Sequence, residues 1–84
     1  MLIQNVKVKV LACDKLHDGA PDGSHRIGRE CMIESLDVNE NMLMVFEADG
    51  AKRYSKTSKV EQISLFEDRI AVITKNHNYS LKRI

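Results

Sequence analysis

The stretch VEQISLFEDRIAVITKNHNYSLKRI, residues Val60–Ile84, decides the fold. Apolar and polar residues alternate around Ile63 and Leu65, and apolar residues recur along Ile70–Thr74. Successive side chains of a strand point to opposite faces, so a period of two predicts strands. The two runs are separated by Glu67-Asp68, a short polar pair that suits a tight hairpin turn. We therefore expect two antiparallel strands joined at this turn.

The rest of the chain shows the same pattern of short runs between turn signals. Asp49-Gly50 is typical of a two-residue hairpin. Pro21-Asp22-Gly23 lies among other turn formers and predicts a long loop over residues 13–26. The polar segment Ser55–Lys59 contains residues that cap helices, so we expect a single helical turn there. Further strands are expected at residues 2–12, 27–36, 42–47, 52–55 and 79–84.

No run of helical length is amphipathic, and short strands at close spacing favour an all-β fold. We expect one domain spanning residues 1–84, a small antiparallel barrel or roll of the SH3-like kind with one long N-terminal loop. Only 5% of the 84 residues are aromatic and none is Trp, which requires an aliphatic core. Tyr54 is expected to point inward. The predicted core consists of Val6, Val8, Val10, Ile33, Val45, Ile63, Leu65, Ile70, Val72 and Leu81.

The last third of the chain resembles the ending of small bacterial and phage β-barrel proteins of unknown function. The residues that carry the resemblance are Thr57-Ser58 with Val60 and Ile63, then Ile70 and the run from Thr74 to Tyr79. In those proteins a Thr-Ser pair precedes one strand and a Thr-x-Asn-x-x-Tyr pattern closes the domain. The family's usual Ser after the Asn is His77 here. The resemblance implies a β-barrel fold and no particular activity.

Charge is distributed unevenly although the net charge is only +1. Residues 31–50 contain five acidic and no basic residues, a net charge of −5, whereas residues 51–84 contain eight basic and three acidic residues, a net charge of +5. Such segments can pair within the sheet or form a two-faced surface that attracts a partner. We expect a cytoplasmic protein, because two cysteines are too few for a disulfide scaffold and no apolar run has the length of a signal peptide or a membrane span.

Two sets of residues in the first part of the chain have the chemistry of a metal or catalytic site. Zinc binds thiolates and imidazoles, but the close pairs typical of zinc sites are missing. The candidate zinc ligands are Cys13, His17, His25 and Cys31, and the alternative is that they are ordinary structural residues. The long loop also gathers Asp14, His17, Asp18, Asp22 and His25, which could act as acids and bases or bind a hard cation. We expect neither a metal nor another cofactor, and no enzymatic activity.

A basic set in the second part of the chain is the strongest candidate binding surface. It consists of Lys52, Arg53, Lys56, Lys59, Lys75, Lys82 and Arg83, accompanied by Tyr54, His77 and Tyr79. Small barrels can bind nucleic acid through a basic face with stacking rings. The alternative is that the rings are buried and the cations only solubilise the surface. Our first hypothesis is a non-catalytic module that binds a protein partner or itself through a sheet edge, and the second is a nucleic-acid-binding barrel.

Overall fold

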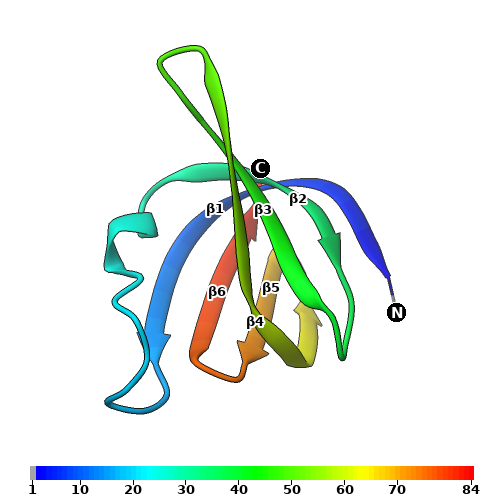
Figure 1. Ribbon diagram of the computed structural model, residues 1–84. Coiled ribbons are helices and arrows are strands. Elements are labelled where there is room, and N and C mark those ends of the chain that lie inside the picture. Colours follow the sequence, from blue (N-terminus) through cyan, green and yellow to red (C-terminus); the bar gives the residue numbers. More distant parts are fainter. Residues whose placement is uncertain (1) are drawn as a thin grey trace.

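The computed structural model describes residues 2–84 and shows six strands and one short 3-10 helix (Figure 1). The elements are β1 (Ile3–Lys15), η1 (Ser24–Arg26), β2 (Glu30–Leu36), β3 (Asn41–Ala48), β4 (Ala51–Phe66), β5 (Arg69–Thr74) and β6 (His77–Arg83). The predicted all-β class with antiparallel strands is therefore confirmed. Within residues 2–84, no helix is long and apolar enough to cross a membrane.

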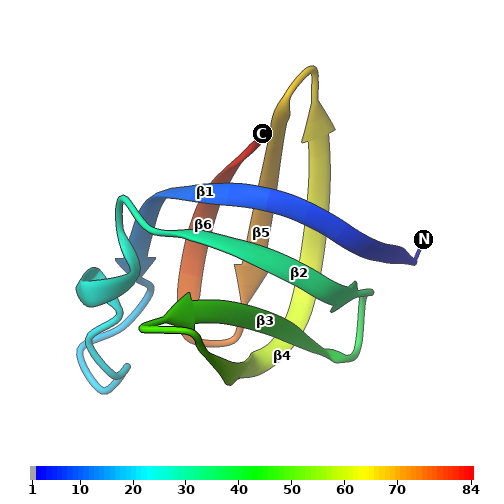
Figure 2. The same ribbon diagram turned by 90° about the horizontal axis from the view of Figure 1, so that it is seen from above.

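The sheet closes into a ring because β1 pairs with both β2 and β6. Two long strands, β1 and β4, each pair with two neighbouring strands, one after the other along their length (Figure 2). The first half of β4 pairs with β3 as far as Lys59, and its second half pairs with β5 from Val60 onward. Register shifts between Val10 and Ala12 and between Val60 and Gln62 interrupt the ladders near these changes of partner. Such irregularities bend a strand, which a closed sheet requires.

Both predicted tight hairpins are present. The β3–β4 turn has Asp49 at φ 53° and Gly50 at φ 78°, which matches the positive φ values of a two-residue hairpin turn. The β4–β5 turn at residues 67–68 has Glu67 at φ 56°. The first hairpin extends beyond the ring as a projecting arm, which we call the β3–β4 arm (residues 46–53) (Figure 1). The second also reaches past the ring (Figure 2).

The core inside the ring is aliphatic, as predicted, with Tyr79 as its largest fully buried side chain. Seven of the predicted core residues are buried: Val8, Val10, Ile33, Val45, Ile70, Val72 and Leu81. Val6 and Ile63 pack against this core but are only partly buried. The prediction for Leu65 is wrong, because its side chain is 44% exposed. Leu65 lies near the end of β4, where the strand pairs with β5 only.

The expected helical turn at Ser55–Lys59 is wrong, since β4 runs unbroken through this segment. Thr57 faces the interior and is 6% exposed, and its β-branched side chain suits a strand. Asn41 Nδ2 donates a 2.6 Å hydrogen bond to the Thr57 carbonyl, and Thr57 Oγ1 accepts one of 3.1 Å from the amide of Met42. Since Thr57 points inward, Tyr54 three positions earlier points outward. The predicted inward orientation of Tyr54 is therefore also wrong, and its side chain is 64% exposed.

The connection between β1 and β2 is shifted relative to the predicted loop. Cys13 still belongs to β1, which continues to Lys15, and β2 begins only at Glu30. Ile27, the first residue of the strand expected at residues 27–36, lies before β2 and is 44% exposed. The late start follows from a turn at Gly28, whose φ is 86° and whose amide donates a 2.7 Å hydrogen bond to the Val10 carbonyl. Residues 16–29 thus form the connection, with η1 inside it.

Candidate functional site

The basic residues predicted as a binding face lie in separate groups. Lys59 and Lys75 are adjacent, since the Lys75 amide donates a 3.0 Å hydrogen bond to the Lys59 carbonyl. Lys82 lies at the other end of β6, opposite Lys9 of β1 and Arg69 of β5. Five strand residues, 77–81, lie between Lys75 and Lys82, which corresponds to roughly 17 Å or more. The set therefore does not form one continuous face.

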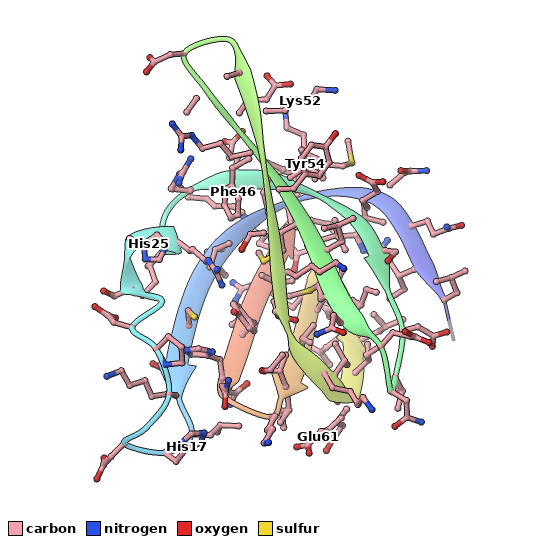
Figure 3. The ribbon with its side chains drawn as sticks, viewed as in Figure 1. His17, His25, Phe46, Lys52, Tyr54 and Glu61 are labelled. Atoms are coloured by element: carbon pink, nitrogen blue, oxygen red, sulfur yellow. The ribbon has the colours of Figure 1, made fainter. Side chains whose placement is uncertain are left out.

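Among the remaining members, Lys52 and Arg53 lie on the β3–β4 arm, Lys56 lies further along β4 opposite Leu43, and Arg83 ends β6 opposite Val8 of β1. Lys52, Arg53 and the adjacent Tyr54 are exposed, and Figure 3 shows Lys52 and Tyr54 at the opposite end of the molecule from Glu61. The other two rings are not available for stacking on a base. Tyr79 is fully buried and His77 is 6% exposed.

The four candidate zinc ligands do not converge. Cys13 and Cys31 are buried free thiols, while His17 and His25 lie at different places along the connection (Figure 3). Burial raises the pKa of Cys13, and it raises the pKa of Cys31 to about 11, so both thiols are protonated at neutral pH. Among residues 2–84, no group of three or more His, Cys, Asp and Glu side chains is arranged to hold a metal ion.

The acidic and imidazole groups of the predicted loop serve local structure. His17 Nε2 donates a 2.8 Å hydrogen bond to Asn76 Oδ1. Asp14 belongs to β1, where it lies opposite Asn78 of β6. The Asp22 carboxylate accepts bonds of 2.9 Å and 3.1 Å from the amide and hydroxyl of Ser24. These bonds lower the pKa of Asp22, with the amide contributing most. Asp18 and His25 are exposed.

A pocket of about 260 Å³ lies where the β1–β2 connection meets β4 and β6, and we call it the polar pocket. It is lined by Pro21, Asp22, Gly23, Arg26, Lys56, Thr57, Ser58, Asn76, His77 and Tyr79. Arg26 is its central cation. Arg26 Nη1 donates a 2.8 Å hydrogen bond to the Tyr79 hydroxyl, and Nη2 donates one of 2.6 Å to Ser55 Oγ. The guanidinium therefore holds η1 against both β4 and β6.

His77 holds the other side of the connection. Its Nε2 lies 2.6 Å from the Pro21 carbonyl oxygen. Because a carbonyl can only accept, the proton of this bond is on Nε2. Gly23 lies between the two anchors, and a Cβ added there would be 2.6 Å from Cys13 Sγ. At position 23 only glycine, which has no Cβ, lets the connection lie this close to the sheet.

Several residues that carried the resemblance to phage β-barrels line the polar pocket or bond to its lining. Ser58 Oγ donates a 2.9 Å hydrogen bond to Thr74 Oγ1, which also accepts bonds from the amides of Asn76 and His77. Thr74 in turn donates to the His77 carbonyl at 3.3 Å. Thr74 is fully buried, so this network fixes the β5–β6 turn from inside. Sequence reasoning found these residues but missed Arg26, because a single Arg among turn formers has no pattern that marks it.

A second candidate surface is the outer edge of the second half of β4. Residues 61–66 pair with β5 on one side and have no strand partner on the other. Two large apolar side chains are exposed here, Leu65 at 44% and Phe66 at 71%. Ile63 is partly buried against the core beside them. We call residues 61–66 the β4 edge.

A wider, open groove of about 600 Å³ lies on the outer face of β1 to β4. Its walls mix opposite charges: Lys7, Glu30, Glu34, Glu47 and Lys52. Lys7 and Glu30 are 3.9 Å apart and both are more than half exposed, so this ion pair contributes little to stability. Nothing in the groove selects one kind of ligand.

The chain matches no protein-family model, no curated protein and no solved structure. Its function is therefore argued from the surfaces described above.

Proposed function

We propose that the protein is a non-catalytic interaction module that binds a protein partner, or a second copy of itself, by adding a strand to the β4 edge. The observation that carries the proposal is the unpaired side of residues 61–66 together with the exposure of Leu65 and Phe66. Main-chain hydrogen bonds give affinity in this mode of recognition, and side chains beside the new strand give specificity.

The two halves of β4 differ in how well charged residues protect them from pairing with another strand. Proteins protect free sheet edges from unwanted pairing with charged residues, lysine above all. The first half of β4 carries four basic residues: Lys52, Arg53, Lys56 and Lys59. The β4 edge carries none, and its last two residues are Leu65 and Phe66. The first half is thus protected against strand addition, whereas the second half is open to it.

The surroundings of the β4 edge define the partner's chemistry. Glu61 and Glu67 lie at its two ends, both are exposed, and neither makes an ion pair with any other residue of 2–84. Between them lie the apolar side chains of Ile63, Leu65 and Phe66. The best complement is an extended segment with apolar residues in its middle and Lys or Arg near its ends.

A comparison of two charge-introducing variants tests this proposal. In the double variant Leu65→Lys and Phe66→Lys, strand addition is blocked, so binding of a partner or self-association is lost. The control is Tyr54→Lys, which places a lysine at an exposed aromatic position on the other half of β4 and leaves binding intact. Affinity purification detects a protein partner, and sedimentation velocity detects self-association. Equal binding by wild type and the double variant contradicts the proposal.

A more specific fold class is also proposed. We assign the ring to the SH3-like class of small β-barrels, because six antiparallel strands, in which two long ones each pair with two neighbours, close around one aliphatic core. Barrels of this size serve as interaction modules by presenting the few edges and faces that closure leaves open.

Nucleic-acid binding is the second candidate, and the exposure of Tyr54 beside Lys52 and Arg53 favours it. A base can stack on an exposed ring while neighbouring cations contact phosphates. Binding of this kind weakens steeply with salt, and replacing Lys56 and Lys59 with Ala weakens it for all sequences alike. Titration of a single-stranded oligonucleotide at low and high salt decides this candidate.

A further inference from the structure

We propose that the polar pocket binds an oxyanion of the phosphate type, either inorganic phosphate or the phosphate group of a small phosphomonoester, with Arg26 as its principal ligand. This site is separate from the β4 edge, and it does not depend on the function proposed above.

Arg26 is a partly buried cation without a counter-anion. Both of its side-chain partners, Ser55 Oγ and the Tyr79 hydroxyl, are neutral, and no carboxylate among residues 2–84 forms an ion pair with it. A guanidinium has five N–H donors, and the two bonds use one each from Nη1 and Nη2. Three donors remain for a ligand. Removing a charge from water without a partner is costly, and a bound anion would offset that cost.

The two bonds also orient the guanidinium. Ser55 lies on β4 and Tyr79 on β6, so the plane of the fork is fixed between two strands. A fork held in this way is pre-organised, and less side-chain entropy is lost when it binds an anion. Planar guanidinium groups match phosphate and carboxylate oxygens in two parallel hydrogen bonds.

The rest of the pocket favours a dianion over a carboxylate. Lys56 contributes a second cation from β4 to the same pocket. Asp22 is the only acidic residue in the lining, and its carboxylate is held by the amide and hydroxyl of Ser24. The lining thus holds two cations, Arg26 and Lys56, against one anion, so a ligand meets a net positive charge.

The size of the pocket limits what can bind. A volume of about 260 Å³ corresponds to roughly nine waters at about 30 Å³ each. Pockets for drug-sized ligands begin at about 300 Å³. A phosphate group fits with part of its water shell, and any larger substituent of a phosphomonoester would extend into solvent.

The test is a titration of the folded chain with inorganic phosphate, with sodium chloride at matched ionic strength as the reference. A ligand that binds only the folded state raises the Tm. Phosphate is expected to raise the Tm saturably, with a Kd of about 1 mM or tighter, and to shift the amide resonances of Ser58, Asn76 and His77. Phenyl phosphate and acetate form two further arms. Phenyl phosphate is expected to bind as well as inorganic phosphate does, and acetate at least roughly tenfold more weakly.

Three variants assign the binding to this pocket. Arg26→Gln is expected to abolish the phosphate response. Lys56→Gln changes an exposed position, so it keeps the fold and weakens binding by roughly tenfold, as loss of one charge-assisted hydrogen bond predicts. Arg53→Gln removes a cation from the β3–β4 arm and keeps the full response. A response that never saturates, or one that Lys56→Gln and Arg53→Gln reduce equally, overturns the proposal.

Discussion

The guanidinium of Arg26 donates a 2.8 Å hydrogen bond to the hydroxyl of Tyr79, 53 positions away in the chain. Tyr79 is fully buried in β6. Its hydroxyl is the one polar atom of an otherwise apolar side chain. The bond joins the β1–β2 connection to the core of the ring. Together with the bonds from Arg26 to Ser55 and from His77 to Pro21, it fixes the position of the connection and of the polar pocket.

Tyr79→Phe removes this acceptor and keeps the ring. We expect a loss of about 1 kcal/mol in the free energy of unfolding, because Arg26 is only partly buried and water can replace the lost acceptor. Urea unfolding followed by circular dichroism measures this loss. The matched control is Tyr54→Phe at an exposed position, which is expected to stay within about 0.5 kcal/mol of wild type. Equal effects of the two substitutions would contradict the structural role of the Tyr79 hydroxyl.

Alkaline pH is expected to destabilise the fold through Tyr79 and Cys31. Burial raises the pKa of Tyr79 from 10.0 to about 12 and that of Cys31 from 9.0 to about 11. Above pH 9 for Cys31 and above pH 10 for Tyr79, the unfolded chain releases protons that the folded chain still holds. Stability therefore falls as pH rises through these windows and is fully present below them.

Single variants show which of the two groups, Tyr79 or Cys31, causes this pH dependence. Urea midpoints measured from pH 8 to pH 12 are expected to fall less steeply above pH 10 in Tyr79→Phe. In Cys31→Ala the fall between pH 9 and about 11 is expected to be smaller. Profiles parallel to that of wild type in both variants would show that neither group is responsible.

Gly23→Ala is expected to displace the β1–β2 connection from the sheet. The added Cβ would be 2.6 Å from Cys13 Sγ, which forces either the connection or β1 to move. A loss of about 1–3 kcal/mol is expected, as for other overpacked sites. Gly19→Ala is the control in the same connection, because its Cβ would meet only the flexible His17 side chain at 3.4 Å.

A double-mutant cycle isolates the contact between Gly23 and Cys13. Cys13→Ala removes the sulfur that the new Cβ would meet. The combined variant is expected to be more stable than the sum of the two single effects predicts, because neighbouring sites are not additive. Additive effects in urea unfolding would show that Gly23 matters for another reason.

The sequence predicted the strands and turns well where the local pattern alone determines them. The alternation from Ile70 to Thr74 and the pair Asp49-Gly50 led to a correct strand and a correct hairpin. Alternation assigns a residue to a face but does not say whether anything covers that face. Leu65 follows the same alternation as Ile63, yet β4 has no second partner there and Leu65 remains exposed.

Local propensity was misleading where tertiary contacts decide the conformation. Ser55–Lys59 contains good helix caps, but pairing with β3 and the bonds to Thr57 keep it in a strand. The polar pocket could not be predicted, because it forms where three segments far apart in the chain meet. Its key bonds join Arg26 to Ser55 and Tyr79, and no spacing rule connects these positions.

Amide hydrogen exchange is the most direct measurement of the central claim, that the β4 edge is the surface through which this protein binds other chains. The measurement compares the isolated protein with the complex that it forms, whether with a purified partner or with a second copy at high concentration. We predict that exchange slows within residues 61–66, where a new strand would pair with free main-chain groups, and not along the β3–β4 arm. Slower exchange in the arm, with residues 61–66 unchanged, would contradict the account.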